Sequence, residues 1–315
     1  MAWPSCAAQS ARTQSWSSTR PHSQESMDQE ASEHSGGLSF FVSPESRSSR
    51  TTLLKSAHKD VMLNSSSILA AALDLDGTII GPDEKISQAV QEAIARLVRH
   101  IPVFIATGRE PADVLRYARE LNLTTPQLCD GGANILDPIQ GVSTWTAPLC
   151  PASAEVVVTK LREMGAAFVA THANGTASTF DDVPNWHLIR VSALDMDEDT
   201  ADTLASHFKD HDQMTVIKAV LPYNGLWAVD FTLAGVDKAT GVSRVGQTLG
   251  IDPGNIVAVG DSYNDLPMLV SCGVSIAMGD APQEVKEAAG FVAPSIADDG
   301  LAVAINDYVM PRIHP

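Results

Sequence analysis

The sequence has few cysteines and no long apolar run, and each shortage excludes a class of protein. The four cysteines, Cys6, Cys129, Cys150 and Cys272, are scattered without Cys-x-x-Cys or histidine-rich spacing. Such spacing indicates neither a disulfide framework nor a zinc site. No uninterrupted apolar stretch approaches the ~20 residues that span a bilayer, so no membrane partner is expected. We therefore expect a cytoplasmic protein.

Basic residues are also scarce, with 21 Lys and Arg against 38 Asp and Glu and a net charge of −17. Affinity for a nucleic-acid backbone depends on clustered basic side chains, so no nucleic-acid partner is expected. The Gly-x-x-x-x-Gly-Lys-Ser/Thr pattern is absent, which excludes a P-loop nucleotide hydrolase. A site built from many carboxylates would need a cation before it could accept a phosphate.

Residues 1–61 are rich in Ser, Arg, Gln and Pro and lack apolar periodicity. Such a composition buries too little surface to offset the entropy of ordering, so we expect a disordered N-terminal extension. Its first 24 residues contain Arg12 and Arg20 but no acid, which weakly resembles an organelle transit peptide. The alternative is that translation starts at Met62 and that the upstream segment is not a natural part of the protein.

The most informative stretch is the apolar run 68–75, which ends in two carboxylates, Asp74 and Asp76. A run that is apolar on both faces is typical of a strand buried in a parallel sheet. Ligands of open α/β sheets bind at the carboxyl ends of the strands, where these acids emerge. Gly77 and Thr78 then turn the chain, and glycine tolerates the positive φ of such turns. We therefore expect a site at Asp74.

The same arrangement recurs at the next predicted strand. Ser87 can cap a helix whose apolar residues lie on one face, and the helix leads to a strand at 101–106. That strand ends in Thr107-Gly108-Arg109, and Pro111 then begins a helix. A hydroxyl and a helix N-terminus at a strand's carboxyl end both suit an oxyanion.

Two further patterns follow near the C-terminus. Lys238 begins a predicted helix, where its charge opposes the macrodipole and requires either a nearby anion or full solvation. The apolar strand 256–259 ends in Gly-Asp-Ser-Tyr-Asn-Asp at 260–265. Its carboxylates, Asp261 and Asp265, suit Mg²⁺, which prefers one or two carboxylates together with water and phosphate oxygens.

The segment between Thr107-Gly108-Arg109 and Lys238 has a different character. It contains two helical patterns, three strand-like runs and a hairpin signal at Asn224-Gly225. We expect an α/β protein with a doubly wound parallel-sheet core in two parts, 62–138 and 235–315. An α+β cap is inserted between them at 139–234. Five cap residues are candidates to line a substrate pocket, although residues of this kind are more often on the surface or in the core: His172, Asn174, Trp186, His187 and Arg190.

Taken in order, the four patterns resemble the motifs of the haloacid dehalogenase-like hydrolases, in their Cof-like, sugar-phosphatase-like branch with a C2-type cap. The resemblance implies that Asp74 is the nucleophile, Asp76 the general acid and base, Thr107 a phosphoryl ligand and Lys238 a charge-balancing group. It implies Mg²⁺ as cofactor, with Asp74, the carbonyl of Asp76 and Asp261 as ligands, and Asp265 either as a direct ligand or one shell out. It also implies phosphate-binding roles for Leu75, Gly77, Gly108 and Arg109, and supporting roles for Gly260 and Asn264.

One position departs from the pattern of the branch, because Asp130 or Gly131 stands where an Asn is common. The resemblance therefore implies no substrate contact for Asp130 or Gly131. The predicted activity is hydrolysis of a small phosphorylated metabolite, such as a sugar phosphate or phosphorylated cofactor, through an aspartyl-phosphate. The alternatives are a phosphoacceptor signalling domain, against which Asp76 and the inserted cap argue, and a phosphomutase. The oligomeric state stays open.

Overall fold

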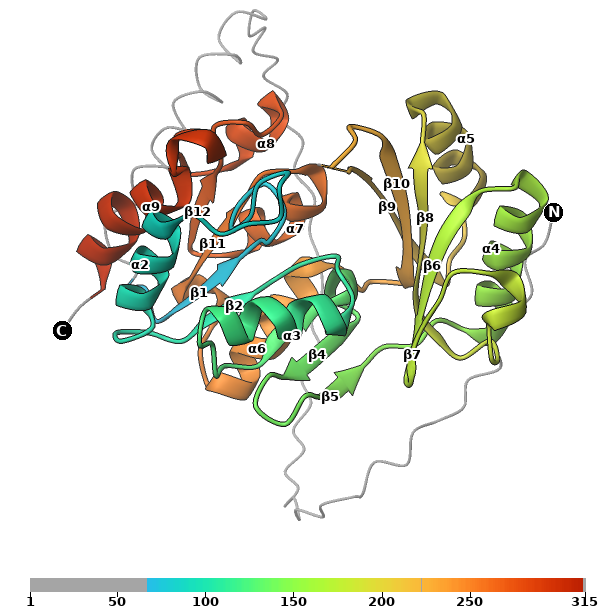
Figure 1. Ribbon diagram of the computed structural model, residues 1–315, viewed down its shortest axis with the longest axis horizontal. Helices are drawn as coiled ribbons and strands as arrows, with labels where there is room; N and C mark the ends of the chain where they lie inside the picture. Colours follow the sequence, from blue (N-terminus) through green and yellow to red (C-terminus); the bar gives the residue numbers. More distant parts are fainter. Residues whose placement is uncertain (1–66, 222, 314–315) are drawn as a thin grey trace, which may run out of the picture. The chain divides into compact units, whose positions relative to one another are not determined.

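The computed structural model describes residues 67–313 except 222, so the expected extension at 1–61 lies outside the described residues. Its core is a five-stranded parallel sheet of order β13-β12-β11-β1-β2 (Figure 1). The strands are β1 Ala70–Leu73, β2 Val103–Ile105, β11 Ile256–Gly260, β12 Val274–Ala277 and β13 Phe291–Val292. Because β1 lies between β11 and β2, the residues that follow it emerge at the sheet's carboxyl edge between the ends of two neighbouring strands.

Helices cover both faces of this sheet. Ala71 and Leu73 of β1 belong to one apolar cluster, and Ala70 and Ala72 to another. The first cluster includes α2 Gln88–Leu97, α3 Pro111–Glu120 and α9 Gly300–Val303. The second includes α6 Lys238–Leu249, α7 Leu266–Ser271 and α8 Gln283–Ala288. This alternation along each strand is what burial on both faces requires, and the predicted doubly wound fold is confirmed.

Local sequence signals explain several of these helices. Ser87 accepts a hydrogen bond from Val90 N–H and caps α2, as predicted. Asp237 and Thr240 form a reciprocal capping box at the start of α6, and Gly250 ends the helix in the left-handed conformation. The remaining short turns are η1 Asp130–Gly132, η2 Phe180–Asp182, η3 Pro253–Asn255, η4 Tyr263–Asp265, η5 Ile296–Asp298, η6 Ala304–Val309 and η7 Met310–Arg312.

A three-stranded antiparallel sheet extends the core. Its strands are β3 Gln127–Cys129, β4 Asn134–Asp137 and β5 Val142–Thr146, and a parallel bridge joins Ala106 to Leu128. Because β5 pairs with β4, the cap boundary predicted at residue 139 falls inside a hairpin. The tight turn of that hairpin, with Gly141 at φ 71°, has no Asn-Gly signal that would have revealed it.

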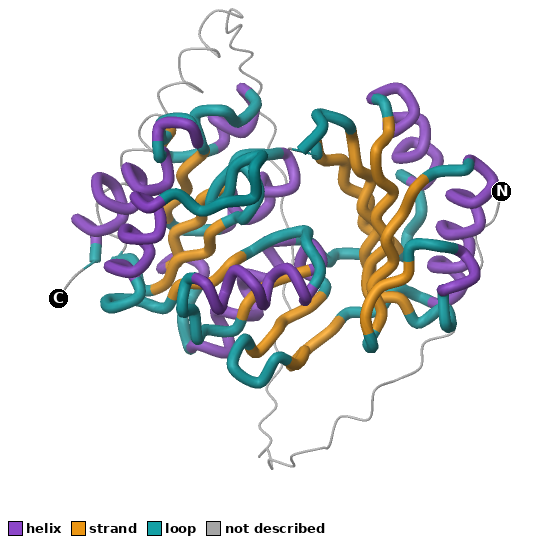
Figure 2. The backbone as a smooth tube through the Cα atoms, in the orientation of Figure 1, coloured by secondary structure: helices purple, strands orange, loops and turns teal. Residues whose placement is uncertain are grey.

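The cap is a five-stranded antiparallel sheet of order β7-β6-β8-β10-β9 with two helices. Its elements are α4 Pro151–Met164, β6 Ala167–His172, β7 Gly175–Ala177, β8 Leu188–Met196, α5 Glu198–Phe208, β9 Met214–Val220 and β10 Trp227–Leu233. Both helices lie on the same side of the sheet (Figure 2). The sequence did not predict β7 and β8, because β7 is short and the charged Arg190 and Asp195 interrupt the apolar pattern of β8. No helix in the described part of the chain is long and apolar enough to cross a bilayer.

Candidate active site

Asp74 and Lys238 form the buried centre of the site. Asp74 follows β1 directly and its side chain is only 5% exposed. The Lys238 ammonium donates to Asp74 Oδ1 at 2.7 Å and to Asp265 Oδ1 at 2.6 Å. Two carboxylates therefore supply the anion that a lysine at a helix start requires.

The turn after β11 fixes the other acids. Asp265 Oδ2 accepts hydrogen bonds from the backbone N–H groups of Asp261 and Ser262, each at 3.0 Å. Gly260 leaves room for this side chain, because a Cβ there would lie 2.5 Å from Asp265 Cγ. Both oxygens of Asp265 are thus engaged by the protein. Asp261 Oδ1, in contrast, is buried and accepts no hydrogen bond from the described residues.

Gly77 has a spatial role that the sequence did not predict. Its N–H donates to the carbonyl of Ile80 at 2.9 Å and is not available to a phosphate in this structure. Its φ is 76°, and a Cβ at this position would lie 2.1 Å from Asp261 Oδ2. Gly77 is therefore needed to leave space for Asp261. The backbone N–H groups of Leu75 and Asp76 form no hydrogen bond within the described residues and fit the predicted contact with an anion.

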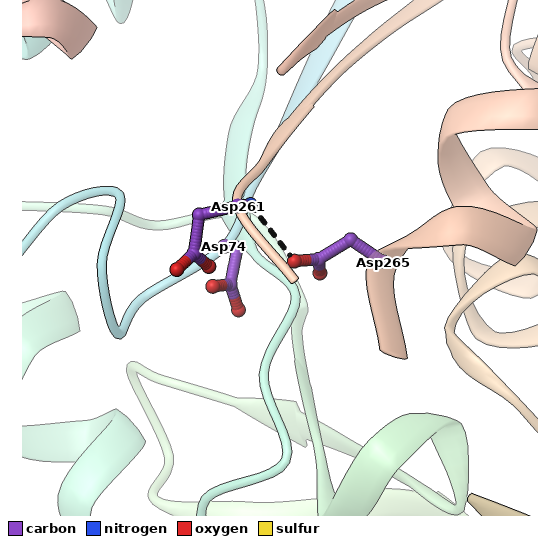
Figure 3. A group of neighbouring side chains, drawn as sticks. All are labelled: Asp74, Asp261 and Asp265. Atoms are coloured by element: carbon purple, nitrogen blue, oxygen red, sulfur yellow. Dashed lines mark hydrogen bonds between the residues drawn. The ribbon is translucent and has the colours of Figure 1, made fainter. Parts of the chain in front are cut away.

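The carboxylates of Asp74, Asp261 and Asp265 have oxygens within 4.8 Å of one another. Figure 3 shows Asp74 and Asp261 pointing into the same space, while Asp265 accepts a hydrogen bond from the Asp261 backbone. A buried, unpartnered carboxylate oxygen beside a second carboxylate suits a hard divalent cation. Asp74 and Asp261 are the candidates for direct ligation, and Asp265 holds Lys238 and the Asp261 backbone.

The pKa shifts follow from this crowding of negative charge. Burial first, and then the charge of Asp265, raise the pKa of Asp74 to about 7 although Lys238 acts to lower it. Burial and the charge of Asp74 hold the pKa of Asp261 well above its usual range. Burial alone would lower the pKa of Lys238, but the charges of Asp265 and Asp74 outweigh it and raise that pKa. One lysine does not neutralise the cluster.

Arg109 is engaged by carboxylates. Its Nε donates to Asp76 Oδ2 at 2.9 Å and its Nη2 to Asp76 Oδ1 at 2.7 Å, a bidentate contact that orients Asp76. Glu84 and Asp113 accept further hydrogen bonds from the same guanidinium at 2.9 and 3.1 Å. Arg109 was predicted to bind phosphate, and in this structure its contacts are with Asp76 and these two neighbours.

Thr107 lies at the end of β2 and is buried. Its hydroxyl oxygen accepts the N–H of Arg109 at 3.1 Å, which fixes the side chain and leaves the hydroxyl hydrogen free to donate. The N–H of Gly108 forms no hydrogen bond within the described residues. Asn264 accepts a hydrogen bond from the Ser262 hydroxyl at 2.7 Å and so stabilises the turn after β11, in agreement with a supporting role.

The structure has a second charged cluster, which consists of Asp130, Arg190 and Asp230. The sequence did not predict that these residues lie together. Asp130 is fully buried, has φ 52°, and accepts hydrogen bonds from Thr171 at 2.8 Å, Asn134 at 3.0 Å and Arg190 Nε at 3.3 Å. Arg190 Nη1 donates to Asp230 Oδ1 at 2.8 Å. Burial raises the pKa of the Asp130 carboxyl, although Arg190 opposes the shift. We call these three residues the Arg190 cluster.

Residues from both the core site and the Arg190 cluster line one cavity of about 520 Å³. The core contributes Asp74, Asp76, Thr107, Gly108, Arg109, Asp261 and Asn264, and the cap contributes Arg190, Asp230 and neighbours on its helix-free sheet face. Of the five cap candidates named from the sequence, only Arg190 lines this cavity. Asp230 was missed because its place beside Arg190 depends on how β8 and β10 pair.

A family model described as haloacid dehalogenase-like hydrolase matches residues 71–185 and 176–305. The chain belongs to this family. A haloacid dehalogenase-like hydrolase from Bacillus subtilis has a similar solved structure, with a TM-score of 0.69 and 18% identity over 76% of this chain and all of its own. The predicted family and fold are confirmed.

Two curated relatives of the chain are named for a particular phosphatase activity. The phosphoglycolate phosphatase of Natronomonas pharaonis is 30% identical over 75% of this chain and 95% of its own length. The 5-amino-6-(5-phospho-D-ribitylamino)uracil phosphatase YitU of Bacillus subtilis (strain 168) is 28% identical over 75% of this chain and 96% of its own length. The predicted enzyme class, a phosphatase, is confirmed at the level of the family.

Proposed function

We propose that the protein is a Mg²⁺-dependent phosphatase that hydrolyses small phosphomonoesters through an aspartyl-phosphate on Asp74. The observation that carries the proposal is the buried Asp74, held by Lys238 and faced by the unpartnered carboxylate oxygen of Asp261. The proposal also agrees with the cavity, which is of a size for small ligands.

Asp74 and Asp76 have separate roles in this mechanism. The Asp74 carboxylate attacks phosphorus, the bond from phosphorus to the leaving oxygen breaks, and Asp76 gives that oxygen a proton. Asp76 then takes a proton from water, whose oxygen attacks phosphorus and breaks the bond to Asp74, which releases inorganic phosphate. In this mechanism Thr107 O–H and the N–H groups of Leu75, Asp76 and Gly108 hold the phosphoryl oxygens.

The residues fit a bound Mg²⁺, which Asp74, Asp261 and the carbonyl of Asp76 would hold. When bound, the cation would offset the negative charge that otherwise repels a phosphate. Lys238, which donates a hydrogen bond to Asp74 Oδ1, contributes the same kind of compensation.

The range of substrates is proposed from chemistry shared by the two named relatives. Phosphoglycolate and the phosphoribityl compound are both small phosphomonoesters, although their leaving groups differ. A sugar phosphate or a phosphorylated cofactor would fit the same description.

The direct test is phosphate release from p-nitrophenyl phosphate and from a panel of small phosphomonoesters, with Mg²⁺ or with excess chelator. We expect release only with Mg²⁺, because the clustered carboxylates repel a phosphate dianion at close range. Undiminished turnover in chelator would contradict the metal requirement. No release from any ester with Mg²⁺ would overturn the proposed function itself.

A further inference from the structure

Glu84 ties the loop between β1 and α2 to the start of α3. Its Oε1 accepts a hydrogen bond from Arg109 Nη2 at 2.9 Å, and its Oε2 lies 3.5 Å from Arg116 Nη2. Its backbone carbonyl accepts a hydrogen bond from the Tyr117 hydroxyl at 3.3 Å. Arg116 also donates to that hydroxyl and lies over the Tyr117 ring. One residue of the loop is therefore fixed through both its side chain and its backbone.

The backbone of Glu84 is held in an unfavourable conformation. Its φ is 58°, in the left-handed region that a residue with a Cβ seldom adopts. Residues in such conformations persist where their surroundings fix them, and they are concentrated at functional sites. A glycine would relieve the backbone, but it would lose the carboxylate that binds the two arginines. This points to a use for the Glu84 side chain.

Arg109 connects Glu84 to the proposed acid and base, Asp76. Its Nε and Nη2 bind the two carboxylate oxygens of Asp76 at 2.9 and 2.7 Å. The remaining donors of the guanidinium reach Glu84, from Nη2, and Asp113, from Nη1 at 3.1 Å. Because the guanidinium is planar and rigid, the two outer carboxylates also fix the direction in which it presents its donors to Asp76.

A bound substrate would compete for the same guanidinium. Arg109 and Asp74 line one cavity, so a phosphoryl group on Asp74 would lie within reach of the Arg109 side chain. A phosphoryl dianion carries more charge than one carboxylate and attracts a guanidinium more strongly. Glu84 and Asp113 oppose this attraction, since they add two negative charges on the side of Arg109 away from Asp76.

We infer that Glu84 is a positioning residue for the acid and base function of Asp76. It holds Arg109 on Asp76 while the phosphoryl group is in the cavity, so that Asp76 stays directed at the leaving oxygen. Without Glu84, Arg109 turns toward the phosphoryl group and Asp76 loses its bidentate contact. The inference rests on the proposed phosphatase activity and adds to it a residue of the loop after β1.

The first test uses two esters of similar shape, phenyl phosphate and p-nitrophenyl phosphate, whose leaving groups differ in their need for a proton. In Glu84→Gln with Mg²⁺, kcat/KM for phenyl phosphate should fall about 10–100-fold, as when a reacting group is misplaced and not removed. That for p-nitrophenyl phosphate should fall much less, because p-nitrophenolate leaves without protonation. A residue that only stabilises the loop would lower both values by the same factor.

The matched control is Asp83→Asn, the neighbouring carboxylate of the same loop. Asp83 is paired with Lys85 at 3.3 Å and does not line the cavity. The ratio of kcat/KM for the two esters should be the same in this variant as in the unchanged protein. If the ratio is also unchanged in Glu84→Gln, Glu84 does not position the acid and the inference is overturned.

The second test asks whether Glu84 acts through Arg109. In a protein that already carries Arg109→Gln, adding Glu84→Gln should change the ratio of the two esters little, because residues that act as one unit are not additive. A change as large as that in the unchanged background would show that the effect does not pass through Arg109. The inference would then be wrong.

The outcomes separate this inference from the proposed function. No phosphate release from either ester by the unchanged protein would mean that the proposed function is wrong. Release with the same ratio of the two esters in all variants would mean that only the inference about Glu84 is wrong. If circular dichroism shows that Glu84→Gln does not fold, Glu84→Asp replaces it, because aspartate tolerates a positive φ but is too short to reach both arginines. The same criterion then applies.

Discussion

The carboxylates of two buried charge clusters are satisfied by the protein to different degrees. In the core, Asp74 and Asp265 share one cation, Lys238, and one oxygen of the neighbouring Asp261 has no partner among the described residues. In the Arg190 cluster, two carboxylates share one guanidinium and the deeper of them is also held by neutral donors. The core cluster is therefore incomplete without a further cation. In the Arg190 cluster, by contrast, each carboxylate has at least one hydrogen-bond donor within the protein.

The largest expected effect comes from the core, at Asp74. Asp74→Asn keeps the shape of the side chain but removes the nucleophile and one candidate metal ligand, so turnover should fall on the order of 10⁴-fold or more. No covalent phosphate should be trapped on the protein after acid quench. Substantial turnover by a folded Asp74→Asn protein that still binds Mg²⁺ would show that the nucleophile is wrongly assigned.

Asp76→Asn should cause the next largest loss, and of a different kind. The nucleophile stays but the proton donor and base is lost, a contribution of ~10²–10⁴-fold in each catalysed step. With p-nitrophenyl phosphate, whose leaving group hardly needs protonation, attack should survive better than hydrolysis of the intermediate. Rapid mixing should show a burst of about one p-nitrophenolate per active site before a slow steady state. A steady rate without a burst would argue against separate roles for the two acids.

A smaller but clear loss is expected from Gly77→Ala. The added Cβ would collide with Asp261, and alanine is disfavoured at φ 76° by roughly 1–2 kcal/mol. We expect a lower melting temperature and weaker Mg²⁺ affinity, measured by calorimetric titration. Gly165→Ala is the matched control, because Gly165 has φ 64° and no atom lies near its Cβ position. Equal Mg²⁺ affinity in both variants would show that Gly77 does not make room for a metal ligand.

The contrast between the clusters also explains what the sequence could predict. Asp74 directly follows an apolar strand, Lys238 begins a helix and Asp265 ends a turn. Their convergence at one edge of the sheet therefore follows from the local sequence pattern. The pair of Arg190 and Asp230 depends on the register between two strands of the cap, one of which has no clear apolar alternation. Nothing local fixes that register, and the pair was not predicted.

The contacts of Arg109 and Gly77 show a second limit. Arg109 was expected to meet a phosphate, but Glu84, from the loop between the first strand and α2, folds back to accept one of its hydrogen bonds. The N–H of Gly77 is taken by Ile80, three residues further along the chain. Residue type and position identified both as site residues, whereas their partners depend on the path of the following loop.

The smallest expected effect concerns stability, and it tests directly whether the core cluster is incomplete. The pKa of Asp74 is raised to about 7 from an ordinary 3.8, and that of Asp261 is also raised. Between pH 3.8 and about pH 7 the Asp74 carboxyl binds more protons in the folded protein than in the unfolded chain. The stability of the folded protein is therefore lost as the pH rises through 7. In chelator, the melting temperature should therefore fall between pH 6 and pH 8, by roughly 2–8 °C at ~2–4 °C per kcal/mol.

Saturating Mg²⁺ should raise the melting temperature at pH 8, because the cation then replaces the protons. The decrease in melting temperature between pH 6 and pH 8 should therefore be smaller with Mg²⁺ than in chelator. Asp261→Asn removes one of the repelling charges, so the protein in chelator should melt at a higher temperature at pH 8 and respond little to Mg²⁺. Asp202→Asn, an exposed carboxylate of the cap, should behave as the unchanged protein in both conditions. If the fall with pH is the same in Asp261→Asn and Asp202→Asn, then the core carboxylates are not the groups that take up the protons. The unpaired negative charge of the core cluster would then not be the cause of the fall in melting temperature.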